Sequence, residues 1–91
     1  MLTLYHRPGC FYCRTVIEAA KQLGAELDLR DTALPEHADE LVRRGGKRQV
    51  PYLVDDEKGV AMYESEDIIE YLHQRFNRSP VRYESVTTIT I

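Results

Sequence analysis

The only two cysteines of the chain, Cys10 and Cys13, stand two residues apart in the segment HRPGCFYCRTV. In a helix, positions i and i+3 lie on the same face, so the two thiols are close enough to form a disulfide that opens and closes without refolding the domain. A ring this small constrains the unfolded chain little and adds little stability. We therefore interpret the pair as a reactive dithiol.

Cys10 is expected to be the attacking thiol, because the helical period of the sequence begins at this residue. The first residues of a helix present unpaired N–H groups and a partial positive charge, both of which favour a thiolate. Such a position can lower a cysteine pKa from about 8.5 into the range of about 3.5–7.5, and Arg7 and Arg14 act in the same direction. Cys13 would then be the resolving thiol.

Two other interpretations of the cysteines stay open at this point. Both thiols could be buried and unreactive, although the preceding Pro-Gly pair places Cys10 at an exposed loop end. A zinc site could take His6, Cys10 and Cys13, but a structural zinc site has four ligands and only His37 and His73 remain. We expect no metal site made by the protein alone.

The elements that must position the cysteines follow the order βαβαββα. Residues 2–5, 25–30, 51–54 and 60–63 have the pattern of strands, and helices are expected from residue 10, over 35–44 and from a cap at Ser65. A right-handed crossover makes the first two strands parallel, and the hairpin at 55–59 adds two antiparallel strands. The sequence predicts an α/β fold with a four-stranded mixed sheet flanked by helices.

The composition indicates one small domain. The 91 residues are 43% hydrophobic and 30% charged, with no apolar run near the roughly 20 residues of a membrane span. The net charge of −3 argues against nucleic acid, and no export signal is visible. We expect a cytoplasmic monomer with a domain over 1–78 and a tail over 79–91, which could be an edge strand, a dimer contact or a flexible end.

Three segments, RPGCFYC, QVPYLVD and YESEDIIEYL, carry a resemblance to known proteins. In this order they resemble the glutaredoxins of the thioredoxin fold, and they are also similar to the N-terminal domains of glutathione transferases. The resemblance covers about residues 1–77. It implies a thioredoxin-like fold and glutathione as a co-substrate.

The resemblance assigns the two ends of a glutathione groove. Val50 and Pro51 match the family's Val–cis-Pro, in which backbone groups of the valine pair with the cysteinyl part of glutathione, although a trans proline also fits a strand start. Ser65, Glu66 and Asp67 match the site of the γ-glutamyl end, where a helix N-terminus takes the carboxylate and an acidic side chain the ammonium. A capped helix start would look similar.

The remaining expected glutathione contacts are Arg7, which matches the basic residue facing the glycine carboxylate, and Tyr12, which matches an aromatic residue lining the groove. A solvated arginine and a packed tyrosine are the alternatives. Two departures from the glutaredoxin pattern stand out. Phe11 replaces a proline common between the cysteines, and the segment 63–65 replaces a glycine pair and is closer to the transferase pattern.

The function that the resemblance implies is that of a glutathione-dependent thiol–disulfide oxidoreductase. The Cys10 thiolate would attack a disulfide-containing or glutathionylated protein, or a glutathione mixed disulfide, and glutathione or Cys13 would resolve the intermediate. The alternative is a dimer that carries a 2Fe–2S cluster on Cys10 of each subunit and two glutathiones. A flavoprotein could also replace glutathione as reductant. Because a complete transferase has a helical second domain, which these 91 residues lack, we expect no transferase activity.

Overall fold

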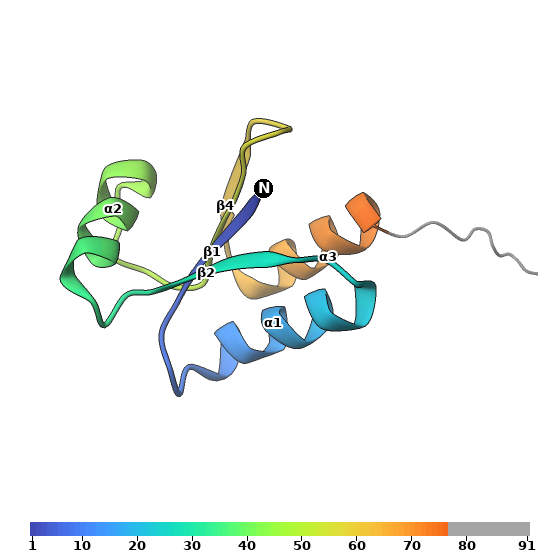
Figure 1. The fold of residues 1–91 in the computed structure, drawn as a ribbon, viewed down its shortest axis with the longest axis horizontal. Coiled ribbons are helices and arrows are strands. Elements are labelled where there is room, and N and C mark those ends of the chain that lie inside the picture. The colour runs from blue at the N-terminus through green and yellow to red at the C-terminus, as the bar shows by residue number, and fades with distance from the viewer. Residues whose placement is uncertain (77–91) are drawn as a thin grey trace, which may run out of the picture.

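The computed structural model describes residues 1–76 and contains seven helices and strands in the predicted order βαβαββα (Figure 1). They are β1 (Leu2–His6), α1 (Phe11–Leu23), β2 (Leu27–Asp31), α2 (Pro35–Gly45), β3 (Tyr52–Asp55), β4 (Val60–Tyr63) and α3 (Ser65–Phe76). No helix in this part of the chain has the length and apolar character that a membrane crossing requires.

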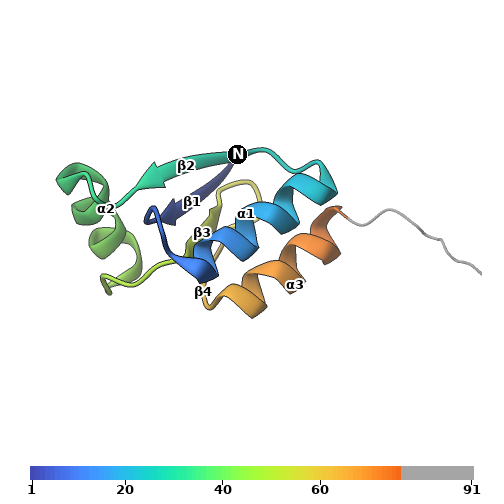
Figure 2. The same cartoon turned by 90° about the horizontal axis from the view of Figure 1, so that it is seen from below.

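The four strands form one mixed sheet in the order β2-β1-β3-β4. β1 pairs with β2 in parallel and with β3 antiparallel, and β3 pairs antiparallel with β4. Helices α1 and α3 lie side by side and run in the same direction, so their N-terminal ends meet at the same end of the molecule (Figure 2). This arrangement is the predicted thioredoxin-like fold.

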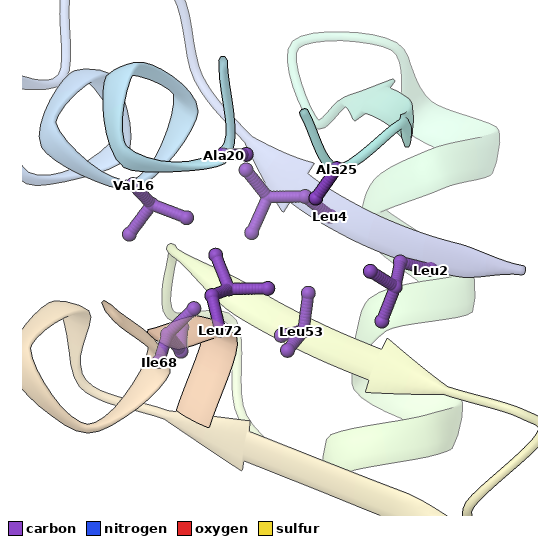
Figure 3. Packing of buried hydrophobic residues seen from close by; sticks show 8 residues of the cluster. All are labelled: Leu2, Leu4, Val16, Ala20, Ala25, Leu53, Ile68 and Leu72. Atoms are coloured by element: carbon purple, nitrogen blue, oxygen red, sulfur yellow. The ribbon is translucent and has the colours of Figure 1, made fainter. Parts of the chain in front are cut away.

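The main core lies between the sheet and the pair α1 and α3. Leu4 and Leu53 project from neighbouring strands toward Val16 of α1 and Leu72 of α3, and all four are fully buried (Figure 3). The rest of the cluster consists of Leu2, Ala20, Ala25 and Ile68. Burial of one leucine or valine side chain contributes about 1.5–3 kcal/mol, so this layer holds both helices in place.

A smaller core covers the opposite face of the sheet. Because side chains alternate along a strand, Tyr5 points away from the face that Leu4 occupies, and it packs with Leu41 of α2 and Tyr52 of β3. All three side chains are at most 5% exposed. Helices therefore flank both faces, as predicted.

The structure corrects several predicted boundaries. The third strand spans Tyr52–Asp55 rather than residues 51–54, so Asp55 belongs to the sheet and not to the turn. The second strand starts at Leu27 rather than residue 25, because Ala25 donates its N–H to the Ala20 carbonyl and belongs to the end of α1. Ser65 is the first residue of α3 and not its cap, because the carbonyl of Glu64 already accepts the first helical bond from Ile68. The predicted boundary at 78 and the tail 79–91 lie outside the described residues.

Candidate functional site

Cys10 is the N-cap residue of α1, as the sequence predicts. Its backbone is extended, with φ −79° and ψ 118°, and its Sγ accepts a hydrogen bond from the N–H of Cys13 at 3.3 Å. Its own N–H donates to the Arg7 carbonyl at 3.1 Å, and Gly9 has a φ of 83° in the loop between them. This tight loop carries the chain from the end of β1 to the first turn of α1 with the sulfur over the helix N-terminus.

The two thiols have opposite electrostatic surroundings. Burial raises the pKa of Cys10, but the contact with Cys13, backbone N–H groups of the first turn and the charge of Arg7 lower it more, so the net shift is downward. Burial raises the pKa of Cys13 to about 12, with a further increase from its contact with Cys10. Cys13 is 1% exposed, whereas Cys10 is only partly buried. The surroundings therefore favour the thiolate form at Cys10 and the protonated thiol at Cys13.

Arg14 is not among the main causes of the lowered pKa of Cys10, which include the charge of Arg7. The Arg14 side chain lines a hollow between α1 and α3 together with Glu18 and His73. The reason is helical geometry: Arg14 stands four residues after Cys10, one turn into the helix, whereas Arg7 lies in the loop whose carbonyl binds the N–H of Cys10.

A cavity of about 540 Å³ opens at the end of the molecule where α1 and α3 begin, and we call it the groove. The loop before β3 forms one wall, the segment from the end of β4 into α3 forms the other, and the first turn of α1 contributes an aromatic side chain. The groove is lined by Tyr12, Gln49, Val50, Pro51, Glu64, Ser65, Glu66 and Asp67.

The groove brings together most of the residues that the sequence singles out for glutathione. Tyr12, Val50, Pro51, Ser65 and Glu66 line it, whereas Arg7 does not and instead lies near Cys10. The Val50–Pro51 peptide bond is cis, as the resemblance implies. Tyr12 is 62% exposed, so it is not a packed helix residue. The contacts that these side chains make with glutathione stay predictions.

Two lining residues, Gln49 and Glu64, were missed by the sequence reasoning. The amide of Gln49 donates to the Glu64 carboxylate at 3.4 Å, which links the two walls. Glu64 has a φ of 74°, in the left-handed region that favours glycine. The available signal was the segment 63–65, where the glutaredoxin resemblance implies a glycine pair, because glycine is typical of a backbone position with positive φ.

The first turn of α3 gives one wall its chemical character. Ser65, Glu66 and Asp67 occupy this turn, where a helix leaves backbone N–H groups without helical partners. Such N–H groups bind a carboxylate, and the acidic side chains attract an ammonium group. The wall therefore suits the end of a molecule that carries a carboxylate and an ammonium group on the same carbon atom.

Within residues 1–76, no three His, Cys, Asp or Glu side chains come together in a way that could hold a metal ion. A cluster shared between two subunits would take one Cys10 from each and two glutathiones, so this finding does not test it. The cluster carrier stays a prediction, and an anaerobic absorption spectrum of fresh protein is its test.

Comparison with known proteins identifies the family. The family model for the glutathione S-transferase N-terminal domain matches residues 4–80. A delta-class glutathione transferase from Nilaparvata lugens is 31% identical, with a TM-score of 0.75 over 92% of this chain and 40% of that chain. A glutathione S-transferase from Anopheles dirus species B is 26% identical, with a TM-score of 0.72 over 90% of this chain and 40% of that chain.

A Bombyx mori glutathione transferase gives a TM-score of 0.73 at 25% identity, over 90% of this chain and 39% of that chain. The chain thus spans about two fifths of the length of these solved relatives. The family match covers the two cysteines, the cis-proline loop and the start of α3. The chain belongs to the glutathione S-transferase N-terminal domain family and has its thioredoxin-like fold.

Proposed function

We propose that this domain binds glutathione in the groove and catalyses thiol–disulfide exchange through Cys10. The observation that carries the proposal is the asymmetry of the two thiols. Cys10 accepts a backbone hydrogen bond at a helix N-terminus and has a lowered pKa, whereas Cys13 is buried with a pKa of about 12. A nucleophile needs the first environment and a resolving thiol tolerates the second.

The reaction begins when the Cys10 thiolate attacks the glutathionyl sulfur of a mixed disulfide. The old S–S bond breaks, a Cys10–glutathione disulfide forms, and the released substrate thiolate takes a proton from solvent. A second glutathione thiolate then attacks the glutathionyl sulfur, which forms glutathione disulfide and restores the Cys10 thiolate. In the other route, the Cys13 sulfur loses its proton and attacks Cys10, which releases glutathione and leaves a Cys10–Cys13 disulfide.

Recognition of glutathione follows from the two walls of the groove. Backbone groups of Val50 bind the cysteinyl part beside the cis proline, and the first turn of α3 binds the γ-glutamyl carboxylate, with Ser65 as a polar contact and Glu66 at the ammonium. Tyr12 covers the groove from α1. Arg7 does not line the groove but lies near Cys10, and from there its charge attracts the glycine carboxylate.

The expected substrates are glutathionylated or disulfide-containing proteins, with glutathione or a flavoprotein as the reductant. The unit that carries this chemistry is the predicted domain over 1–78, acting as a cytoplasmic monomer. Coupled assays with each reductant distinguish the two sources of electrons.

The family match favours a second candidate function, the transfer of glutathione to an electrophile. In that reaction the groove holds glutathione in the same way, and the glutathione sulfur attacks a carbon atom of the electrophile instead of a disulfide. Neither Cys10 nor Cys13 changes its oxidation state. Conjugation of glutathione to an aryl halide is the direct assay. Turnover that survives in the Cys10→Ser variant would favour this candidate.

The experiment that tests the proposed function is reduction of a low-molecular-weight glutathione mixed disulfide by the wild type, Cys10→Ser and Cys13→Ser. We expect Cys10→Ser to abolish turnover and Cys13→Ser to retain much of it, because a second glutathione can resolve the Cys10–glutathione disulfide without Cys13. Equal loss in both variants would contradict the division of labour between the thiols.

A further inference from the structure

Tyr63 links the two segments of the chain that form the walls of the groove. It is the last residue of β4 and directly precedes Glu64 of one wall. Its hydroxyl accepts the N–H of Lys47 at 3.1 Å and donates to the carbonyl of the same residue at 3.0 Å. Lys47 belongs to the loop that carries the other wall, so the Tyr63 side chain satisfies both backbone groups of one residue of that loop.

The ring that carries this hydroxyl has two packing contacts. Tyr52 packs against it with ring centroids 4.4 Å apart, and the ammonium group of Lys47 lies 5.0 Å from its centroid. Gly45, the last residue of α2, lies against the hydroxyl. A methyl group there would overlap the Tyr63 hydroxyl oxygen and come within 3.0 Å of Tyr52. The absence of a side chain at Gly45 leaves the space that the Tyr63 hydroxyl occupies.

A second link joins the same two walls, because the Gln49 amide donates to the Glu64 carboxylate at 3.4 Å. That link connects two exposed or half-exposed side chains, which hold geometry weakly. The Tyr63 hydroxyl instead binds main-chain groups from a packed ring. The spacing of the walls therefore depends on Tyr63 more than on Gln49.

We propose that Tyr63 is a positioning residue for glutathione: by fastening residues 46–51 to the end of β4, it sets the distance between Val50 and the first turn of α3. The proposal rests on the proposed function, since it concerns glutathione held across these walls. Tyr63 does not line the groove, so its effect acts through the loop and not through contact with the ligand.

The test is Tyr63→Phe, which keeps the ring and removes only the hydroxyl. We expect the KM for glutathione to rise on the order of fivefold, from the loss of two modest hydrogen bonds, with kcat and the alkylation rate of Cys10 changed by less than about twofold. Amide hydrogen exchange at Lys47 should become faster. Tyr71→Phe is the matched control, because it also removes one tyrosine hydroxyl, bound to Asp55 at the far end of β3.

Gly45→Ala supplies an independent test, because its methyl group displaces the Tyr63 hydroxyl while alanine itself suits a helix. It should raise the KM for glutathione as Tyr63→Phe does. An unchanged KM in Tyr63→Phe, or an equal rise in Tyr71→Phe, would overturn the proposal. Wild-type protein that binds no glutathione would refute the proposed function instead, and unchanged exchange at Lys47 in Tyr63→Phe would then still overturn the role of Tyr63.

Discussion

Asp55 is the most buried carboxylate among the described residues, and its replacement by asparagine gives a quantitative test of the fold. The residue is 1% exposed at the end of β3. Its side chain accepts hydrogen bonds from the Tyr71 hydroxyl at 2.5 Å, from Arg75 Nε at 3.3 Å and from the N–H of Glu57 at 3.1 Å. These contacts tie the β3–β4 turn to the C-terminal half of α3, at the end of the helix away from the groove.

The magnitude follows from the partners that remain. Removal of one member of a fully buried ion pair costs about 3–5 kcal/mol. Arg75 is 26% exposed and keeps its contact with Glu57 at 3.0 Å, and the asparagine oxygen still accepts one hydrogen bond. We therefore expect Asp55→Asn to lower the free energy of unfolding by about 2 kcal/mol. For a domain of this size, that loss lowers Tm by roughly 8–16 °C.

The same variant has a distinct pH dependence. Burial raises the pKa of Asp55, but the hydrogen bonds from Tyr71 and Arg75 lower it more, so the pKa lies below its ordinary value. The stabilisation is then fully present above the unfolded-state pKa of about 3.9 and is lost as pH falls through the folded-state value. Urea unfolding followed by circular dichroism at neutral and acidic pH measures both effects. A loss below about 0.5 kcal/mol at neutral pH, or a difference from wild type that does not shrink in acid, would refute this reasoning.

Two further predictions concern the site. Ser65→Ala and Glu66→Ala should each raise the KM for glutathione by several fold without lowering Tm, because each removes one polar contact of about 0.5–3 kcal/mol. Glu70→Ala, on an exposed part of α3, is the control. An unchanged KM in both variants would remove Ser65 and Glu66 from the site. Iodoacetamide at neutral pH should modify Cys10 and leave Cys13 unmodified, because the pKa of Cys13 is about 12; peptide mapping that finds both labelled at similar rates would contradict the assigned thiolate.

The parts of the fold that the sequence predicts are those with a local cause. Alternating and helical periods identify every strand and helix over residues 1–76, and the start of α1 next to Cys10 follows from the preceding Pro-Gly pair. The strand boundary at Ala25 failed because its N–H is used by the end of α1, a bond that the alternating pattern does not reveal. The cis bond before Pro51 came from resemblance and not from local chemistry.

The parts that the sequence does not predict depend on residues far apart in the chain. Asp55 was expected in the polar hairpin turn, yet it is buried because Tyr71 and Arg75 reach it from α3, 16 and 20 residues later. The link between Gln49 and Glu64 spans 15 residues. Pairings of this kind leave no period in the sequence, so they become visible only in the three-dimensional structure.

The most direct test of the central claim is to trap the first intermediate. The Cys13→Ser variant is mixed with glutathione disulfide, and its mass and tryptic peptides are measured before and after addition of excess glutathione. We expect one glutathione on Cys10, formed faster than on a model thiol and removed by glutathione, and no adduct in Cys10→Ser. The absence of an adduct on Cys10, or formation of one on Cys13 of Cys10→Ser at the same rate, would contradict the proposal that Cys10 is the attacking thiolate.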